Sequence, residues 1–321
     1  MASGILQLLA LFQAPNILIV KYLNIIRWPN VLMTVLTQLL VIYCILEPSG
    51  LPLALKIWQV ALLLVATALL TAGGNVINDI YDVVIDAVNK PEKVIVGKSI
   101  TEERAFTIYM LLTSVAVICG FILANSVNRP ILAVVFVVVA FVLYSYATTL
   151  KSMLLVGNIV ISLLVGLVIL IPGVFELVPV ATPQTREAQV FLMSLLLDFA
   201  ILATVVNLAR EWVKDCEDIN GDHAGGRNTL PITLGRTRAA RFVSVFILGI
   251  IAALTWYVYT YLFKNQIAVY YFILAIIGPL LVVVIKLWNA STTKEYRLQS
   301  KILKMVLLLG IMSIAVIQLK F

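Results

Sequence analysis

An apolar run over residues 57–74 leads into the stretch Asn75-Val76-Ile77-Asn78-Asp79-Ile80-Tyr81-Asp82-Val83-Val84-Ile85-Asp86. Its carboxylates Asp79, Asp82 and Asp86 are spaced at i, i+3 and i+7, so on a helix they point in nearly one direction. Carboxylates held that close repel one another, and an apolar span beside them supplies little water. A ligand set of oxygens without Cys or His suits Mg²⁺. The stretch therefore predicts a helix end that presents a magnesium site.

The same spacing occurs a second time, in Asp215-Cys216-Glu217-Asp218-Ile219-Asn220-Gly221-Asp222, again after a long apolar run. One such cluster could be a solvated helix end, but two copies at the ends of apolar runs favour a shared site. Six carboxylates are enough for about two or three Mg²⁺ ions, which also keep waters and take phosphate oxygens. We therefore expect six residues to act as metal ligands and in catalysis: Asp79, Asp82, Asp86, Asp215, Asp218 and Asp222.

The composition is that of a membrane protein. Of 321 residues, 62% are hydrophobic and 12% charged, and the mean hydropathy is +1.06. A soluble domain usually has about 25% charged residues. We therefore expect a single all-α integral membrane domain over residues 1–321. The net charge of +7 fits basic loops on one side of a membrane and does not imply nucleic acid.

Nine apolar segments are long enough to cross a membrane as helices. Their expected bounds are 31–46, 57–77, 105–124, 130–146, 154–175, 190–209, 242–262, 269–287 and 303–317. Of the 23 Lys and Arg residues, 18 fall on the side of the membrane that holds both acidic stretches, and five fall on the other. The positive-inside rule then places the acidic stretches and the N-terminus in the cytoplasm and the C-terminus outside.

Basic and amide side chains accompany the acids. Lys93, Arg210 and Lys214 lie next to the two acidic stretches, and metal ions together with Lys and Arg make a clamp for a diphosphate. Topology and contact with anionic membrane lipids are the alternative explanation for any one of these residues. Asn75 and Asn78 are one turn apart and can orient a carboxylate or a phosphate.

A diphosphate clamp at the mouth of an apolar helix bundle implies a substrate with a charged head and an apolar tail, such as a polyprenyl diphosphate. Metals would stabilise the leaving diphosphate while the allylic C–O bond ionises and a second substrate attacks the cation. Tyr146 could stabilise that cation through its ring face, or it could be an interfacial aromatic. Asp198 lies within an apolar span, where it faces a functional cavity or makes a polar contact.

The chain resembles the UbiA-type intramembrane prenyltransferase superfamily over nearly its whole length. Asn78-Asp79-x-x-Asp82-x-x-x-Asp86 and Asp215-x-x-Asp218-x-x-x-Asp222 are similar to the two signature motifs of that superfamily. The resemblance implies nine transmembrane helices around a central cavity, dependence on Mg²⁺, and transfer of a prenyl group from a polyprenyl diphosphate. It also implies that Arg27 lies by the site and that Asn30 lies near the diphosphate.

Within the superfamily, the run Arg210-Glu211-x-x-Lys214-Asp215 and the following Gly226-x-x-Thr229-Leu230-Pro231 are similar to geranylgeranylglycerol-phosphate geranylgeranyltransferases. So is Tyr146-x-x-x-Leu150-Lys151, which adds Lys151 to the expected substrate-binding residues. This favours a glycerol-phosphate lipid as acceptor, with an aromatic quinone precursor as the alternative.

One run departs from the superfamily. Many relatives carry Asn-Arg-Pro-x-Arg-Pro after the first motif, whereas this chain reads Asn89-Lys90-Pro91-Glu92-Lys93-Val94. The positive charge is kept, but the bidentate geometry of a guanidinium is lost. A different class of function, a cation or metabolite transporter, would place its acids near the bilayer midplane on broken helices. These acids instead cluster at one membrane face.

Overall fold

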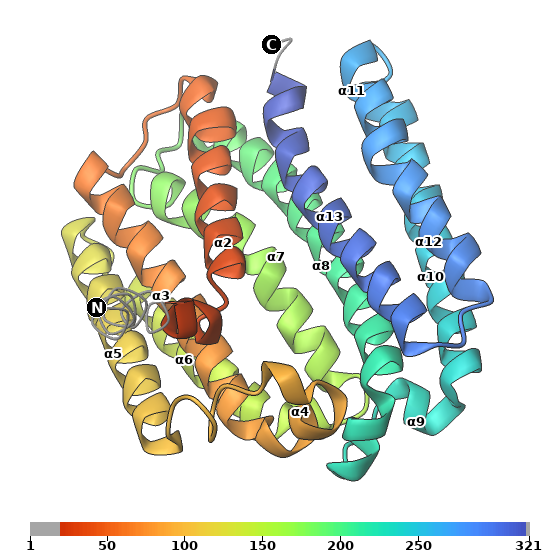
Figure 1. Ribbon diagram of the computed structural model, residues 1–321. Helices are drawn as coiled ribbons and strands as arrows, with labels where there is room; N and C mark the ends of the chain where they lie inside the picture. Colours follow the sequence, from red (N-terminus) through yellow and green to blue (C-terminus); the bar gives the residue numbers. More distant parts are fainter. Residues whose placement is uncertain (1–19, 319–321) are drawn as a thin grey trace, which may run out of the picture.

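The computed structural model describes residues 20–318. Within that range all of the named secondary-structure elements are helices (Figure 1). Nine of these helices are long and apolar enough to cross a membrane, which confirms the predicted fold class and number of spans. They are α2 (Trp28–Val41, continued to Ser49), α3 (Ile57–Tyr81), α5 (Glu102–Ser126), α6 (Ala133–Thr148), α7 (Val156–Leu177), α8 (Arg186–Ala224), α10 (Arg236–Tyr257), α11 with α12 (Gln266–Tyr271 and Gly278–Trp288) and α13 (Thr293–Gln318). Two short α-helices, α4 (Val83–Asn89) and α9 (Leu230–Leu234), lie in connecting segments.

The largest difference from the predicted bounds concerns α8, which was expected over 190–209 and extends over 39 residues. At about 1.5 Å per residue it is about 58 Å long, whereas the hydrocarbon layer is about 30 Å thick. Its end therefore projects beyond the apolar layer. The helix stops at Gly225 and Gly226, and Gly226 has the left-handed φ of 69° that favours glycine after a helix. All three aspartates of the second motif lie on this projecting end, as their spacing predicts.

The first motif is not carried on one continuous helix, so that prediction is wrong. Helix α3 ends at Tyr81 and α4 begins at Val83, with Asp82 between them at φ −94° and ψ 0°. Val83 and the residues after it continue as helix α4, so we attribute the break at Asp82 to the attachment of Asn89, at the end of α4, to α8. Helix α4 turns away from the axis of α3 and lies across the end of the bundle (Figure 1).

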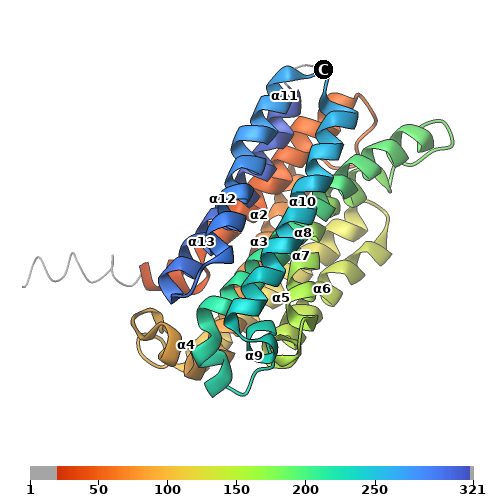
Figure 2. The ribbon, with the colours of Figure 1, turned by 90° about the vertical axis from the view of Figure 1, so that its right-hand side faces the viewer.

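The long helices lie side by side, and α4, α9 and the projecting end of α8 gather at one end of the bundle (Figures 1 and 2). Helix α4 is attached to α8 through Asn89, which accepts from the amide of Gly221 at 2.9 Å and donates to the carbonyl of Asp218 at 2.9 Å. A Cβ atom on Gly221 would lie 2.2 Å from Asn89 Nδ2, so only glycine permits this approach. The contact holds the two motifs, far apart in the chain, beside each other.

Candidate active site

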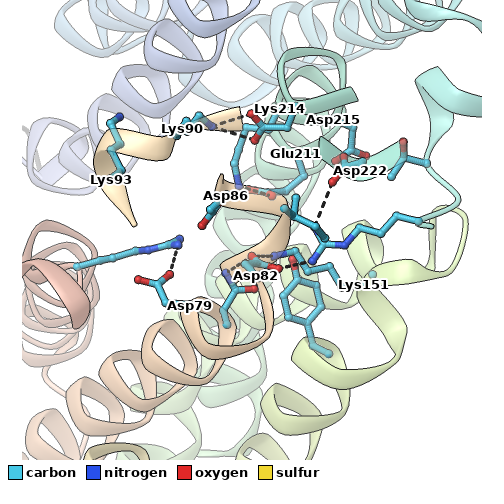
Figure 3. A pocket seen from close by; sticks show the side chains of 18 of the residues that line it. Asp79, Asp82, Asp86, Lys90, Lys93, Lys151, Glu211, Lys214, Asp215 and Asp222 are labelled. Atoms are coloured by element: carbon cyan, nitrogen blue, oxygen red, sulfur yellow. Dashed lines mark hydrogen bonds and ion pairs between the residues drawn. The ribbon is translucent and has the colours of Figure 1, made fainter. Parts of the chain in front are cut away.

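A cavity of about 590 Å³ lies at the end of the bundle where the two motifs meet (Figure 3). Twelve of the predicted site residues line it: Arg27, Asn78, Asp79, Asp82, Asp86, Lys93, Tyr146, Lys151, Lys214, Asp215, Asp218 and Asp222. The structure therefore brings both motifs to one cavity, which is the arrangement that their shared spacing predicts.

The carboxylates of the first motif face basic side chains from other elements. Arg27 donates to Asp79, and Asp82 accepts from both Lys151 and Arg227. Asp82 is 5% exposed, so these partners neutralise a charge that has little access to water. Burial alone would raise the pKa of Asp82, but the charges of Lys151 and Arg227 outweigh it and hold the pKa below its usual value. Asp82 is thus an ionised carboxylate at the centre of an ion-pair network.

Lys151 is placed by two residues in addition to Asp82. Its ammonium group donates to Asn78 Oδ1 at 2.6 Å and lies 5.8 Å from the ring centroid of Tyr146. Burial lowers the pKa of Lys151, and the attraction of Asp82 does not fully offset it because Arg227 adds repulsion. The predicted cation-stabilising ring and a predicted substrate-binding lysine are therefore neighbours at the cavity wall.

The carboxylates of the second motif have fewer cationic partners. Asp215 accepts from the neutral amide of Asn158 at 3.0 Å. Asp218 accepts from Lys90 at 2.9 Å, and Lys90 also lies 3.2 Å from Glu217. Asp215 therefore bonds to a neutral side chain, whereas the other motif aspartates that have a side-chain partner each pair with a Lys or Arg.

Arg227 joins the two motifs directly. One of its terminal nitrogens donates to Asp222 at 3.1 Å and the other donates to Asp82. The cavity wall also includes polar and charged residues that were not among the predicted site residues, of which Lys90, Asn158, Glu211 and Arg227 bond to other side chains of the wall. Lys90 and Arg227 follow the two motifs in the chain, so a search for cations beside each motif would have found them.

Three predicted substrate-binding residues do not line this cavity: Asn30, Asn75 and Arg210. Asn75 donates to the carbonyl of Ile26 at 2.9 Å and so holds the segment that carries Arg27. Asn30 accepts from Lys304 at 2.8 Å. Asn75 is therefore a positioning residue, and Asn30 belongs to contacts between α2 and α13.

Arg210 and Lys214 both contact Glu211, a buried acid on the same helix. Arg210 donates to it at 2.7 Å and Lys214 at 2.9 Å, and of the two cations only Lys214 lines the cavity. Lys93 is exposed at the cavity rim and makes no ion pair within the described part of the chain (Figure 3). Lys93 and Lys214 are thus the predicted cations of the cavity wall that pair with no motif aspartate.

Asp198 and His223 lie away from the cavity. Asp198 is exposed on the surface of α8 and accepts from Tyr257 at 3.3 Å. His223 is exposed near the end of α8 and is not part of the cavity wall. Of the two readings of Asp198, the structure agrees with a polar contact.

The cavity is lined by alternating carboxylates and cations. Among residues 20–318 no three Asp, Glu, His or Cys side chains come close enough together to hold an ion, because Lys and Arg side chains stand between the acids. Asp86 contacts none of them; burial raises its pKa, and the charge of Asp82 adds to that effect. Such a lining can receive a metal and an anion together, since carboxylates can take the metal while the displaced cations take phosphate oxygens.

A family model described as the UbiA prenyltransferase family matches residues 31–308 of the chain. Digeranylgeranylglyceryl phosphate synthase of Methanothrix thermoacetophila is 38% identical over 193 residues, which cover 60% of this chain and 64% of that protein. The protein of the same name from Methanobrevibacter smithii is 33% identical over 241 residues, which cover 75% of this chain and 78% of that one. The match to the first of these relatives thus spans slightly less than two thirds of its length.

Solved structures agree in fold. A structure of digeranylgeranylglyceryl phosphate synthase in membranes is 24% identical with a TM-score of 0.58, and the match covers 92% of this chain and 98% of that one. A UbiA homolog from Archaeoglobus fulgidus, bound to DMAPP and Mg²⁺, is 15% identical with a TM-score of 0.57 and is covered to 99%, against 92% of this chain. At these identities the likeness concerns the arrangement of the helices.

Proposed function

The chain belongs to the UbiA prenyltransferase family, and we propose that it transfers a prenyl group, most simply geranylgeranyl, from a polyprenyl diphosphate to a lipid acceptor that carries a glycerol phosphate. The observation that carries this proposal is the single cavity in which both aspartate motifs meet lysine and arginine side chains. The names of the relatives support the choice of acceptor.

The resident metal fits the side chains present. Six aspartates line one cavity, no Cys or His of the described residues 20–318 lines it, and such an oxygen donor set suits Mg²⁺. We propose that Asp79, Asp82, Asp86, Asp215, Asp218 and Asp222 hold it. When bound, Mg²⁺ neutralises the charge that develops on the departing diphosphate.

The side chains of the cavity have separate roles in the transfer. Arg27, Lys151 and Arg227 bind oxygens of the donor diphosphate and orient its allylic carbon. The C–O bond of the donor breaks and leaves a cation, which the ring face of Tyr146 stabilises. The acceptor hydroxyl oxygen forms the new C–O bond, and its proton leaves with the diphosphate. The products are an ether lipid and diphosphate.

A transporter remains the alternative from a different class, but the acids lie at one end of the spans and not midway along them. Within the family, an aromatic quinone precursor is the alternative acceptor. It would react through a ring carbon and then lose a ring proton.

The orientation in the membrane is part of the proposal. The charge bias of the loops supports a cytoplasmic position for the cavity and the N-terminus. A reporter fused after Phe321 should lie outside the cytoplasm, and one inserted at Lys98 should lie within it. Both reporters on one side would contradict the alternation of the spans.

The proposed function is tested with purified protein, Mg²⁺ and radiolabelled geranylgeranyl diphosphate, offered geranylgeranylglyceryl phosphate or an aromatic quinone precursor in turn. We expect label in the ether lipid, diphosphate release that EDTA stops, and recovery when Mg²⁺ is restored. Transfer to the aromatic compound alone would overturn the acceptor. No transfer to either, or indifference to EDTA, would overturn the reaction.

A further inference from the structure

Helices α8 and α13 pack along each other and bring a second group of cations together beside the cavity. Their register is fixed by Arg297, which donates to Glu217 at 2.9 Å. The two helices run in opposite directions. The position seven residues before Glu217 on α8 therefore faces the position seven residues after Arg297 on α13, about two turns along each helix. These positions hold Arg210 and Lys304.

The group consists of three cations and one carboxylate, that of Glu211. Arg210 and Lys214 both pair with Glu211, at 2.7 and 2.9 Å. Lys304 donates to the neutral side chain of Asn30 at 2.8 Å and makes no ion pair within the described part of the chain. The positive charges of Arg210, Arg27 and Lys214 all repel that of Lys304. The group therefore has an excess of positive charge.

Arg210 also has an unused donor. Its Nε atom is buried and has no hydrogen-bond partner within residues 20–318. A buried donor without a partner is unfavourable, and so is a partly buried lysine in an apolar span without an anion. One anion bound between α2, α8 and α13 would remove both deficits.

The cations that contact the motifs differ from this group. Arg27, Lys151, Lys90 and Arg227 each pair directly with a motif aspartate, so they serve the metal and the diphosphate. Lys304 and Arg210 do not line the cavity, whereas Lys214 does. The excess charge is therefore next to the reaction site but separate from the diphosphate clamp.

We propose that Lys304, Arg210 and Lys214 form an anion subsite that binds the phosphate monoester of the acceptor lipid. The proposal rests on the proposed function, because that function requires an acceptor with a phosphate of its own. A separate subsite keeps two anionic substrates apart while Lys214, at the cavity wall, places the acceptor near the donor. Asn30 holds Lys304 in position when the acceptor is absent.

The test compares two acceptors, geranylgeranylglyceryl phosphate and its dephosphorylated alcohol, at a fixed donor concentration. In Lys304→Ala, kcat/KM for the phosphate-bearing acceptor should fall about tenfold or more, the loss expected for a charged hydrogen bond, while kcat/KM for the alcohol is unchanged. The KM for the donor should also be unchanged. Lys304→Arg should keep the preference for the phosphate-bearing acceptor, and Arg210→Gln should lose part of it.

Lys301→Ala is the matched control, because Lys301 is exposed one turn earlier on α13. An equal loss for both acceptors in Lys304→Ala would show a structural role and overturn the subsite. If added anionic phospholipid changes the kcat/KM of Lys304→Ala by the same factor for both acceptors, the three cations bind a membrane lipid. That result would also overturn the acceptor subsite. If the proposed function itself fails, the wild type transfers to neither acceptor. If only the subsite fails, the wild type transfers and Lys304→Ala shows no change in its preference between the two acceptors.

Discussion

The two aspartate motifs have the same spacing but different surroundings. The first is divided between α3 and α4, and its central Asp82 contacts two cations from distant segments. The second lies on the uninterrupted α8, and the one side-chain hydrogen bond that its Asp215 makes within residues 20–318 is with the amide of Asn158. Spacing along the chain therefore does not set the charge balance, since the partners come from other elements. Asp82 therefore stabilises the fold through ion pairs as well as forming part of the site, whereas Asp215 makes no such ion pair within the described residues.

The largest expected effect comes from removing these two carboxylates in turn. Asp82→Ala and Asp215→Ala should both abolish prenyl transfer, because each removes a proposed metal ligand. Only Asp82→Ala should also destabilise the fold, by about 3 kcal/mol, since it leaves the half-buried Lys151 without a carboxylate partner and Arg227 with Asp222 alone. Thermal unfolding in detergent, with the exposed Glu103→Ala as control, measures this difference. Equal unfolding temperatures for the two variants would remove the distinction between the motifs.

A smaller effect is expected at the residue that connects the motifs. Arg227→Ala should lower kcat/KM about tenfold to a hundredfold, because a charge-assisted contact is lost on each side. Arg227→Lys should be intermediate, since a single ammonium group cannot bridge Asp82 and Asp222 as a guanidinium does. Arg238→Ala, at an exposed position of α10, is the control. If Arg227→Ala were as active as this control, the bridge would have no part in the reaction.

The smallest effect is expected at Lys93, on the cavity rim. Its side chain is exposed, so Lys93→Ala should raise the KM for the donor only about threefold to tenfold and leave that for the acceptor unchanged. Lys98 is unsuitable as a control because it donates to the carbonyl of Pro91 at 2.7 Å and so supports the same segment. The exposed Lys294→Ala serves instead. If the KM for the donor in Lys93→Ala equals that in this control, Lys93 does not bind the diphosphate, which would then be held by the metals and the other cations of the cavity wall.

Much of the fold follows from the sequence because hydropathy, span length and loop charge are local properties of the chain. The cluster of Asp215, Asp218 and Asp222 follows for the same reason, since helical periodicity alone places them on one face. The break at Asp82 does not follow, because it depends on how α4 is attached to α8. The contact between Lys304 and Asn30 joins the two ends of the chain, and no local pattern predicts that pairing.

Metal binding itself tests whether the two unlike motifs act as one site. Mn²⁺ can replace Mg²⁺ and be followed by electron paramagnetic resonance, with geranylgeranyl thiolodiphosphate as a donor that does not react. The wild type should bind Mn²⁺ saturably, and Asp82→Asn and Asp218→Asn should each weaken binding about tenfold or more, although they lie on different motifs. Wild-type affinity in either variant would contradict a shared metal site.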